Sequence, residues 1–186
     1  MVLILASQSP RRRDLLASAG LTFEVRVTGL EEIRNPGEPA ADYVERLARD
    51  KAFALDASPG EWILAADTTV VAGDEVLEKP SSPEDAVRMI RLLAGAWHEV
   101  LTGVCLRDGS HCWTAVESTR VHFVPMSEAE IQEYVASGEP MDKAGAYGIQ
   151  GLASRFIDRV DGCYFNVVGL PVARVFALLK TAGYKP

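Results

Sequence analysis

Residues 7–13, which read SQSPRRR, combine hydroxyl and guanidinium groups that could bind an anion. Ser9 is a favourable N-cap and Pro10 suits the first helical position, so we expect a helix to begin here. A helix N-terminus presents free backbone N–H groups and the positive end of the helix dipole. A solvated helix face is the alternative for the three arginines, but cations at this end oppose the dipole unless an anion neutralises them. The segment therefore favours a phosphate site.

Two further charged residues, Lys51 and Asp67, occur in otherwise apolar surroundings. Lys51 falls in the apolar stripe of a helix expected over residues 41–57, so its ammonium either snorkels to water or points into the anion site. Asp67 follows the apolar run 62–66, which is typical of a central buried strand. Ligands collect at the carboxyl ends of such strands, which places Asp67 for chemistry, although an Asp that caps a turn is common.

The adjacent carboxylates of Glu31 and Glu32 follow a strand expected over residues 21–27. Beside a phosphate site such a pair forms either a solvated turn or a set of metal ligands, and the spacing alone favours the turn. Lys79 lies at the end of a hairpin that turns at Gly73-Asp74. The returning strand is expected to bring Lys79 back toward the Asp67 end of the hairpin.

Periodicity and turn signals predict strands that alternate with helices. We expect helices over residues 9–19, 41–57, 82–94 and 127–138 and a last helix from residue 170. We expect strands over residues 2–6, 21–27, 62–66, 70–72, 76–77, 100–107, 112–124, 155–160 and 163–168. Asp108-Gly109 and Asp161-Gly162 are the turn signals of two further hairpins. At 186 residues the chain suits one domain, or one core with a lobe.

Composition and charge limit the classes of partner. A net charge of −7 and a pI near 5.0 argue against a nucleic-acid backbone as partner, whereas a small anion needs only a local positive pocket. No apolar run has the length of a membrane span, and the N-terminus does not resemble a signal peptide. Three cysteines without paired spacing fit a reducing cytoplasm and argue against a zinc cluster.

Separated segments between Leu3 and Leu179, nearly the whole chain, resemble the motifs of the Maf family, in the expected order. These segments are Ser7-x-Ser9-Pro10-Arg11-Arg12, Glu32 after Thr28-Gly29, Lys51, Ala66-Asp67-Thr68, Glu78-Lys79-Pro80, residues 143–151 (KAGAYGIQG) and residues 166–171 (NVVGLP). Any one of them is weak evidence, but their shared order is highly specific.

The resemblance implies a house-cleaning nucleoside triphosphate pyrophosphatase, which cuts between the α- and β-phosphates and releases a monophosphate and pyrophosphate. It implies an α/β fold, a mixed β-sheet with flanking helices and two lobes around a central cleft, similar to the inosine triphosphatase (Maf/Ham1) type. Residues 1–186 would form this as a single domain. Residues 143–151 resemble the branch of the family that acts on dTTP and UTP.

The resemblance also implies roles for individual residues. Asp67 matches the family's proton acceptor, and Asp67 with Glu32 would hold a divalent cation, Mg²⁺ or Mn²⁺. The positions that select the base are matched by Arg11, Thr68 and Gln150. The positions on the phosphate side are matched by Ser7, Arg12, Lys51 and Lys79. The implied reaction is in-line attack of water on the α-phosphorus, in which positioning and charge neutralisation do most of the work.

Two other functions are compatible with these residues. One is a pyrophosphatase for modified or non-canonical nucleotides, which shares the mechanism and differs in the base pocket. The other is a nucleotide-binding regulator of cell division and septum formation, which would keep the cations without needing Asp67; we rank it below the enzyme. The expected partner is a nucleoside triphosphate in the cytoplasm, without nucleic acid or membrane. The oligomeric state stays open, with a homodimer among the options.

Overall fold

The computed structural model describes residues 1–109 and 111–185, and the chain divides into two compact units. Unit 1 comprises Met1–Thr68, Thr102–Glu117 and Gly169–Pro186. Unit 2 comprises Thr69–Leu101 and Ser118–Val168. Each unit is therefore assembled from segments that are distant in the sequence. The expectation of a single domain over residues 1–186 stays a prediction.

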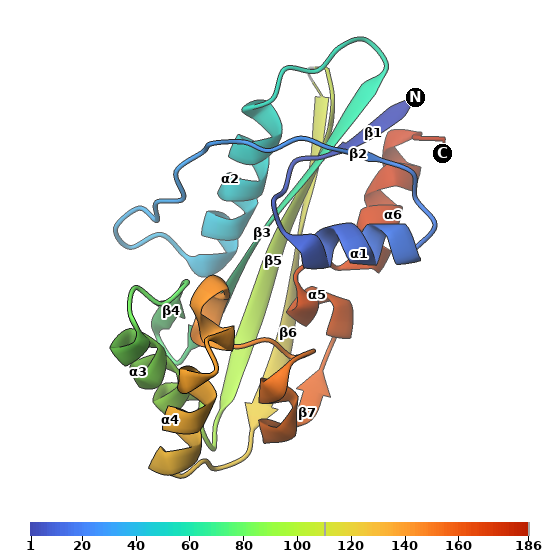
Figure 1. Cartoon of the computed structure of the whole chain (residues 1–186). Helices are drawn as coiled ribbons and strands as arrows, with labels where there is room; N and C mark the ends of the chain where they lie inside the picture. Colours follow the sequence, from blue (N-terminus) through green and yellow to red (C-terminus); the bar gives the residue numbers. More distant parts are fainter. Residues whose placement is uncertain (110, 186) are drawn as a thin grey trace. The chain divides into compact units, whose positions relative to one another are not determined.

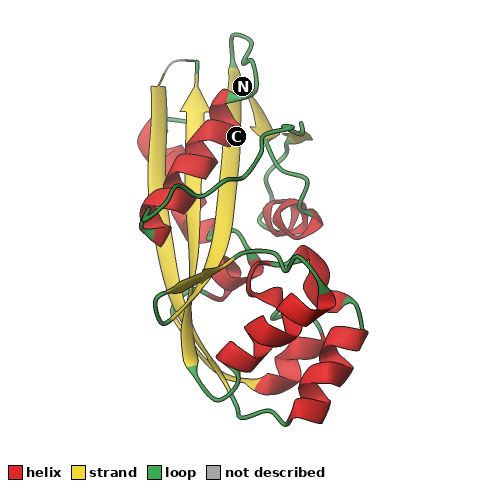
Figure 2. Cartoon of the chain, turned by 90° about the vertical axis from the view of Figure 1, so that its left-hand side faces the viewer, coloured by secondary structure: helices red, strands yellow, loops and turns green. Residues whose placement is uncertain are grey.

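The strands form a mixed seven-stranded sheet in the order β2-β1-β3-β5-β6-β7, with β4 paired to β3. β1 pairs in parallel with both β2 and β3, whereas the β3–β4 and β6–β7 pairs are antiparallel. β3, β5 and β6 are the three long strands (Figure 2). The strands are β1 (Val2–Leu5), β2 (Glu24–Val25), β3 (Glu61–Ala72), β4 (Glu75–Leu77), β5 (Trp97–Asp108), β6 (His111–Phe123) and β7 (Ile157–Asp161).

Unit 1 has helices on both faces of its strands, with α2 (Ala40–Phe53) on one and α1 (Pro10–Ser18) and α6 (Val172–Ala182) on the other (Figure 1). The alternation of side chains along β1 produces this arrangement. Leu3 belongs to a buried cluster with Leu16 of α1 and Val175 of α6, whereas Ile4 packs with Ala48 of α2. Because both faces are covered, β1 is apolar throughout rather than alternating.

Unit 2 contains the helices α3 (Pro83–Leu93), α4 (Glu128–Ala136) and α5 (Tyr164–Val168) and the short 3₁₀ helices η1 (Glu139–Asp142), η2 (Ala144–Ala146) and η3 (Leu152–Phe156). α3 and α4 lie side by side. Three buried rings, those of His98, Phe123 and Tyr147, pack edge to face with centroids 4.9–5.3 Å apart. The His98 Nε2 and the Tyr147 hydroxyl lie 2.8 Å apart, within hydrogen-bonding distance.

Three serines begin helices as the sequence predicts. The hydroxyls of Ser9, Ser82 and Ser127 accept hydrogen bonds from the backbone N–H groups three residues later. Around Ser127 the Glu130 side chain also returns to the backbone N–H of the serine, which completes a capping box. Among the described helices, none is both long and apolar enough to span a membrane.

The strand expected over residues 163–168 is wrong, because this segment forms α5. The hydroxyl of Thr119 accepts from the Cys163 N–H at 3.0 Å and lies 3.2 Å from the Cys163 carbonyl, so the chain is held as it leaves Gly162. The buried Asn166 amide donates to the Val100 carbonyl and to Thr119. These side-chain contacts replace the ladder that a hairpin would have formed.

Two other expected strands are shorter or displaced. The strand predicted over residues 21–27 is reduced to β2, because only two residues pair with β1 at this edge of the sheet. Val25 and Val27 are consequently exposed rather than buried. The strand predicted over residues 155–160 begins later, at Ile157, because Arg155 and Phe156 belong to η3.

Candidate active site

The guanidinium of Arg12 is the centre of a polar cluster in unit 1. Arg12 Nε donates to the Gly169 carbonyl at 2.8 Å, and Nη1 donates to the Ala66 carbonyl at 2.8 Å and to Ser7 Oγ at 3.3 Å. Its Nη2 donates to Thr68 Oγ1 at 3.0 Å. The Arg12 side chain of α1 thus connects three parts of unit 1. These are Ser7 after β1, Ala66 and Thr68 within β3, and Gly169 before α6.

The ammonium of Lys51 lies between two carboxylates. Its Nζ is 2.5 Å from Asp67 Oδ1 and 2.6 Å from Glu32 Oε1. Lys51 and Asp67 are both buried, and the Glu32 side chain is 39% exposed. Snorkelling to water, one of the two predictions for Lys51, is therefore wrong: α2 directs the ammonium at the acidic groups.

Asp67 does not follow the end of its strand, as the sequence predicted, because β3 continues through it to Ala72. The strand that ends beside Asp67 is β1. Its register with β3 runs from Val2 to Leu5, which pairs with Leu64, and the Ala6 N–H still donates to the Leu64 carbonyl. Beyond that point β1 leaves the sheet, so the apolar run of β3 gives way to polar residues where its neighbour ends.

Burial and neighbouring charges have opposing effects on the pKa of Arg12. Burial lowers the pKa of its guanidinium, whereas the charges of Asp67 and Glu32 raise it and that of Arg11 lowers it further. The cluster therefore holds two cations, Arg12 and Lys51, against two carboxylates. A cluster with so little net charge can lie in a protein interior and still present charged groups to a ligand.

Two residues that the sequence did not single out complete the cluster. The hydroxyl of Thr102, which is fully buried on β5, lies 2.9 Å from Thr68 Oγ1, and either group can donate. The Gly169 carbonyl accepts from Arg12, and its φ of +122° favours glycine. Gly169 belongs to the segment 166–171 that carried the family resemblance, whereas nothing in the local sequence distinguishes Thr102 from other strand threonines.

The three arginines at the start of α1 have different surroundings. Arg12 is bonded as described, Arg11 is half-buried, and Arg13 is exposed with its Nε 3.7 Å from Asp14. The buried Ser7 hydroxyl accepts from the Ser9 N–H as well as from Arg12. The three arginines of the predicted phosphate segment therefore differ: Arg12 is bonded to residues of β3, Arg11 is half-buried and Arg13 is on the surface.

Two of the predicted site residues, Lys79 and Gln150, belong to unit 2. Lys79 is exposed in the segment that follows β4. Gln150 is exposed in the turn before η3. Next to Lys79, the Glu78 carbonyl accepts a hydrogen bond from the Gly145 N–H at 3.1 Å, which connects the hairpin with the glycine-rich loop. The other predicted site residues, Ser7, Arg11, Arg12, Glu32, Lys51, Asp67 and Thr68, all belong to unit 1.

Comparison with known proteins assigns the chain to a family. The family model described as "Maf-like protein" matches residues 2–182. The chain belongs to the Maf family. A relative from Koribacter versatilis, named dTTP/UTP pyrophosphatase, is 51% identical over 98% of this chain and 95% of its own length. Relatives of the same name from Anaeromyxobacter dehalogenans and Geobacter metallireducens are 54% and 50% identical, with similar coverage.

A solved structure of a HAM1 protein from Coxiella burnetii is 13% identical and covers 81% of this chain and 89% of its own, with a TM-score of 0.45. The family assignment confirms the resemblance found in the sequence. The mixed sheet with flanking helices confirms the expected fold class. The residue roles carried over from the Maf family are predictions still to be tested.

The acidic residues of this Maf chain fit a hard divalent cation in kind and charge. Asp67 and Glu32 supply carboxylate oxygens, the ligands that Mg²⁺ prefers, and Mg²⁺ commonly binds through one or two carboxylates plus water and substrate phosphates. Both carboxylates already meet at one positive centre, the Lys51 ammonium. Over residues 1–109 and 111–185, no group of three or more His, Cys, Asp and Glu side chains is arranged to hold a metal ion. Asp67 and Glu32 stay the predicted protein ligands of such an ion.

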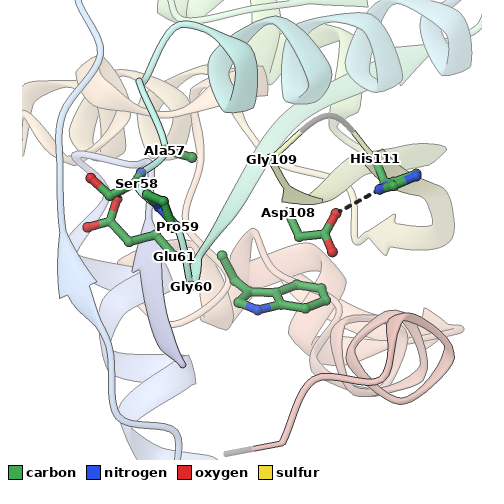
Figure 3. A pocket seen from close by; sticks show the side chains of 9 residues that line it. Ala57, Ser58, Pro59, Gly60, Glu61, Asp108, Gly109 and His111 are labelled. Atoms are coloured by element: carbon green, nitrogen blue, oxygen red, sulfur yellow. Dashed lines mark hydrogen bonds and ion pairs between the residues drawn. The ribbon is translucent and has the colours of Figure 1, made fainter.

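A pocket of about 410 Å³ in unit 1 is distinct from this cluster. It is lined by the segment 57–62 and by Asp108, Gly109 and His111 (Figure 3). His111 Nδ1 lies 3.3 Å from Asp108 Oδ1 there, and Trp62, which is part of the lining, stacks on Trp113. The lining contains none of the residues that the Maf resemblance assigns to the site.

Proposed function

We propose that this Maf-family chain is a nucleoside triphosphate pyrophosphatase that hydrolyses dTTP and UTP to the monophosphate and pyrophosphate. The observation that carries the proposal is the contact of the buried Lys51 ammonium with Asp67 and Glu32, whose charges also act on the guanidinium of Arg12. The two cations of this cluster can bind a polyanion, and its carboxylates can accept a proton at the same place. The full-length similarity to relatives named dTTP/UTP pyrophosphatase supports the substrate class.

In the proposed reaction Asp67 is the general base. Its carboxylate accepts a proton from a water molecule as the water oxygen bonds to the α-phosphorus, and the bond to the bridging oxygen breaks, so that pyrophosphate leaves with that oxygen. The 2.5 Å contact with Lys51 fixes the orientation of the carboxylate for this task. Lys51 is in turn held by α2, whose buried stripe includes Leu47 and Ala48.

We assign the phosphate side to Ser7, Arg12, Lys51 and Lys79. Arg12 uses Nε and Nη1 on protein acceptors, so its contribution is a fixed positive charge rather than a mobile clamp. Lys79 is exposed, and its long side chain carries a positive charge that suits a phosphate group. Positive charge held in place before the reaction stabilises the charge that develops on pyrophosphate without reorganisation.

Glu32 and Asp67 would hold Mg²⁺ or Mn²⁺. When bound, such an ion polarises phosphoryl oxygens and lowers the pKa of coordinated water. Lys51 lies against both carboxylates and lowers the repulsion between them.

We assign base selection to Gln150, with Arg11 and Thr68 as further donors. Uracil and thymine present an acceptor, a donor and an acceptor on their pairing edge, and one glutamine amide carries both a donor and an acceptor. Cytosine carries a donor amino group at position 4, where uracil and thymine carry an acceptor carbonyl. It would therefore leave a hydrogen-bonding group of the site unpaired, which costs about 1–3 kcal/mol. Thr68 is already bonded to Arg12, which makes Gln150 the principal residue for reading the base.

The experiment that tests this proposal is a panel of nucleoside triphosphates assayed for pyrophosphate, with and without Mg²⁺ or Mn²⁺. We expect metal-dependent turnover with kcat/KM for dTTP and UTP above that for CTP, and purines excluded mainly by size. Gln150→Glu should narrow the difference between UTP and CTP more than it changes the metal dependence. Release of single orthophosphates, or no turnover with any metal, would refute the proposal.

We further propose that this activity takes place in the cytoplasm. Cys105, Cys112 and Cys163 are free thiols, which suits a reducing compartment. A nucleoside triphosphate is the proposed partner. Fractionation of cells that express the tagged chain at its natural level checks the location.

A further inference from the structure

The turn that carries Gln150 is attached to one carboxylate in unit 2, that of Glu139. Glu139 Oε2 accepts from the Leu152 N–H at 2.8 Å, and Oε1 accepts from the Ala153 N–H at 3.4 Å. These are the first N–H groups of η3, which have no partner within the helix itself. Glu139 therefore caps η3 from thirteen residues earlier in the sequence, and the capped N–H groups begin two residues after the exposed Gln150.

Gly151 leaves room for this carboxylate. A Cβ atom built on Gly151 would overlap both carboxylate oxygens of Glu139. The φ of Gly151 is −102°, which any residue adopts, so space rather than backbone conformation requires glycine here. The Gly151 N–H closes the turn by donating to the Gly148 carbonyl at 3.0 Å.

Glu139 has further hydrogen-bond partners in unit 2. The hydroxyl of Tyr134, a fully buried residue of α4, donates to Glu139 Oε1 at 2.9 Å. The Lys143 ammonium donates to the Glu139 carbonyl at 2.7 Å and to Asp142 at 2.5 Å. A Cβ on Gly148 would approach the Lys143 side chain to 2.8 Å. The turn is thus packed between two anchored side chains, while Gln150 itself points to solvent.

We propose that Glu139 is a positioning residue for base selection: it fixes the backbone that follows Gln150 and so sets where the Gln150 amide meets the base. The inference rests on the proposed function in one respect, the role of Gln150 in recognising the base. In this role Glu139 acts through the Leu152 and Ala153 N–H groups rather than by binding the nucleotide itself. Its loss should therefore alter selectivity and KM more than kcat.

The first test is a pair of substitutions, Glu139→Ala and Glu139→Gln. Glu139→Ala removes every acceptor, and we expect kcat/KM for UTP to fall about tenfold, mostly through KM, and the preference for UTP over CTP to shrink by a similar factor. Glu139→Gln should restore most of both, because the amide oxygen can still accept the shorter bond from Leu152 and the amide nitrogen can donate to Tyr134, so that only the 3.4 Å bond from Ala153 is lost. A Glu139→Ala protein that folds and keeps its UTP-to-CTP ratio would overturn the inference.

Glu133→Gln is the matched control. Glu133 lies on α4 close to Glu139 in sequence, but its carboxylate is exposed and pairs with Arg155 at 3.2 Å. We expect this variant to keep the parent's KM and its selectivity. An equal loss in the control would mean that any acidic group of this region suffices, and would count against Glu139.

A double-mutant cycle with Gly151→Ala tests the shared space directly. In the parent, the added methyl group displaces the Glu139 carboxylate and should reduce selectivity about as much as Glu139→Ala does. In the Glu139→Ala background the same methyl group meets no carboxylate, so Gly151→Ala should add little. Fully additive losses would show that Gly151 and Glu139 act independently and would contradict the inference.

Amide hydrogen exchange separates this inference from the proposed function. We expect faster exchange at Leu152 and Ala153 in Glu139→Ala, with the amides of α3 unchanged. If the parent protein releases no pyrophosphate from any nucleotide, the proposed function fails while this result still supports Glu139 as the anchor of the turn. Unchanged exchange at both amides would overturn the inference whatever the activity.

Discussion

Unit 1 and unit 2 each organise a predicted site residue around a carboxylate, but with different kinds of donor. In unit 1 the carboxylate of Asp67 meets a charged side chain, the Lys51 ammonium. In unit 2 the carboxylate of Glu139 meets two backbone N–H groups and a neutral hydroxyl. A side-chain partner can respond to a ligand that brings its own charge, whereas backbone donors fix the shape of the chain. On the proposed assignments, the carboxylate of unit 1 would serve the chemistry and that of unit 2 would position the principal residue for base selection.

The largest effect should follow from Asp67→Asn. The amide keeps the size of the carboxylate but removes the charge and the ability to accept a proton, so kcat should fall at least about a hundredfold. The melting temperature should change little, because an amide still accepts from Lys51. Steady-state kinetics with UTP and thermal unfolding check both parts.

Near-normal turnover in Asp67→Asn would move the general base to another acid and make Glu32 the next residue to substitute. It would also weaken the contrast between the units, since the carboxylate of unit 1 would then serve structure alone.

Lys51→Met should have a smaller effect on activity and should also lower stability. Without the ammonium, Asp67 and Glu32 lose their shared partner, and kcat/KM should fall by about tenfold or more. Stability should also fall, by roughly 2 kcal/mol, because a buried carboxylate is left without its charged partner. Added Mg²⁺ should recover part of the melting temperature, since the two carboxylates can then bind the ion together.

Lys180→Met is the control for Lys51→Met, since Lys180 is an exposed residue in the last turn of α6. It should leave both the turnover and the melting temperature near those of the parent. An unchanged kcat/KM in Lys51→Met would remove Lys51 from the phosphate side, and an unchanged stability would show that the two carboxylates do not need it.

The smallest effect concerns His98 of unit 2 and the pH dependence of stability. Burial lowers the pKa of His98 from 6.5 to about 4, with a small contribution from His122. The folded state therefore binds fewer protons than the unfolded state between these values, so stability is full above pH 6.5 and declines as the pH falls toward 4. Between pH 7.5 and 5.5 this amounts to roughly 1 kcal/mol.

Urea unfolding at the two pH values measures this loss, and His98→Phe should reduce the pH dependence whatever its effect on absolute stability. His111→Ala, at an exposed histidine, is the control and should keep the parent's slope. Equal slopes in the parent and in His98→Phe would exclude His98 as the source.

Local signals in the sequence were sufficient for much of the fold. A serine cap needs only the residues of its own first turn, and the starts at Ser9, Ser82 and Ser127 are all confirmed. The segment 163–168 was predicted wrongly because its conformation depends on Thr119 and Val100, which are distant in sequence. Propensity cannot include contacts of that kind.

In the candidate site, too, local sequence predicts some residues, whereas others depend on contacts between distant segments. Lys51 was recognisable as an unusual charge on a buried helix face, but its partners Asp67 and Glu32 come from a strand and a loop that only the fold brings together. Glu139 gave no signal at all, because a glutamate before Pro140 is ordinary on a surface. Its role becomes visible through the backbone donors of a helix that begins thirteen residues later.

The location of the bond that breaks tests the central claim most directly. UTP hydrolysed in water enriched in heavy oxygen, with the products separated by mass spectrometry, shows which phosphorus the water attacks. The proposed reaction, with Asp67 as the base and pyrophosphate as the leaving group, predicts one heavy oxygen in the phosphate of UMP and none in pyrophosphate. Heavy oxygen in the pyrophosphate, or in orthophosphate released instead of it, would contradict attack at the α-phosphorus.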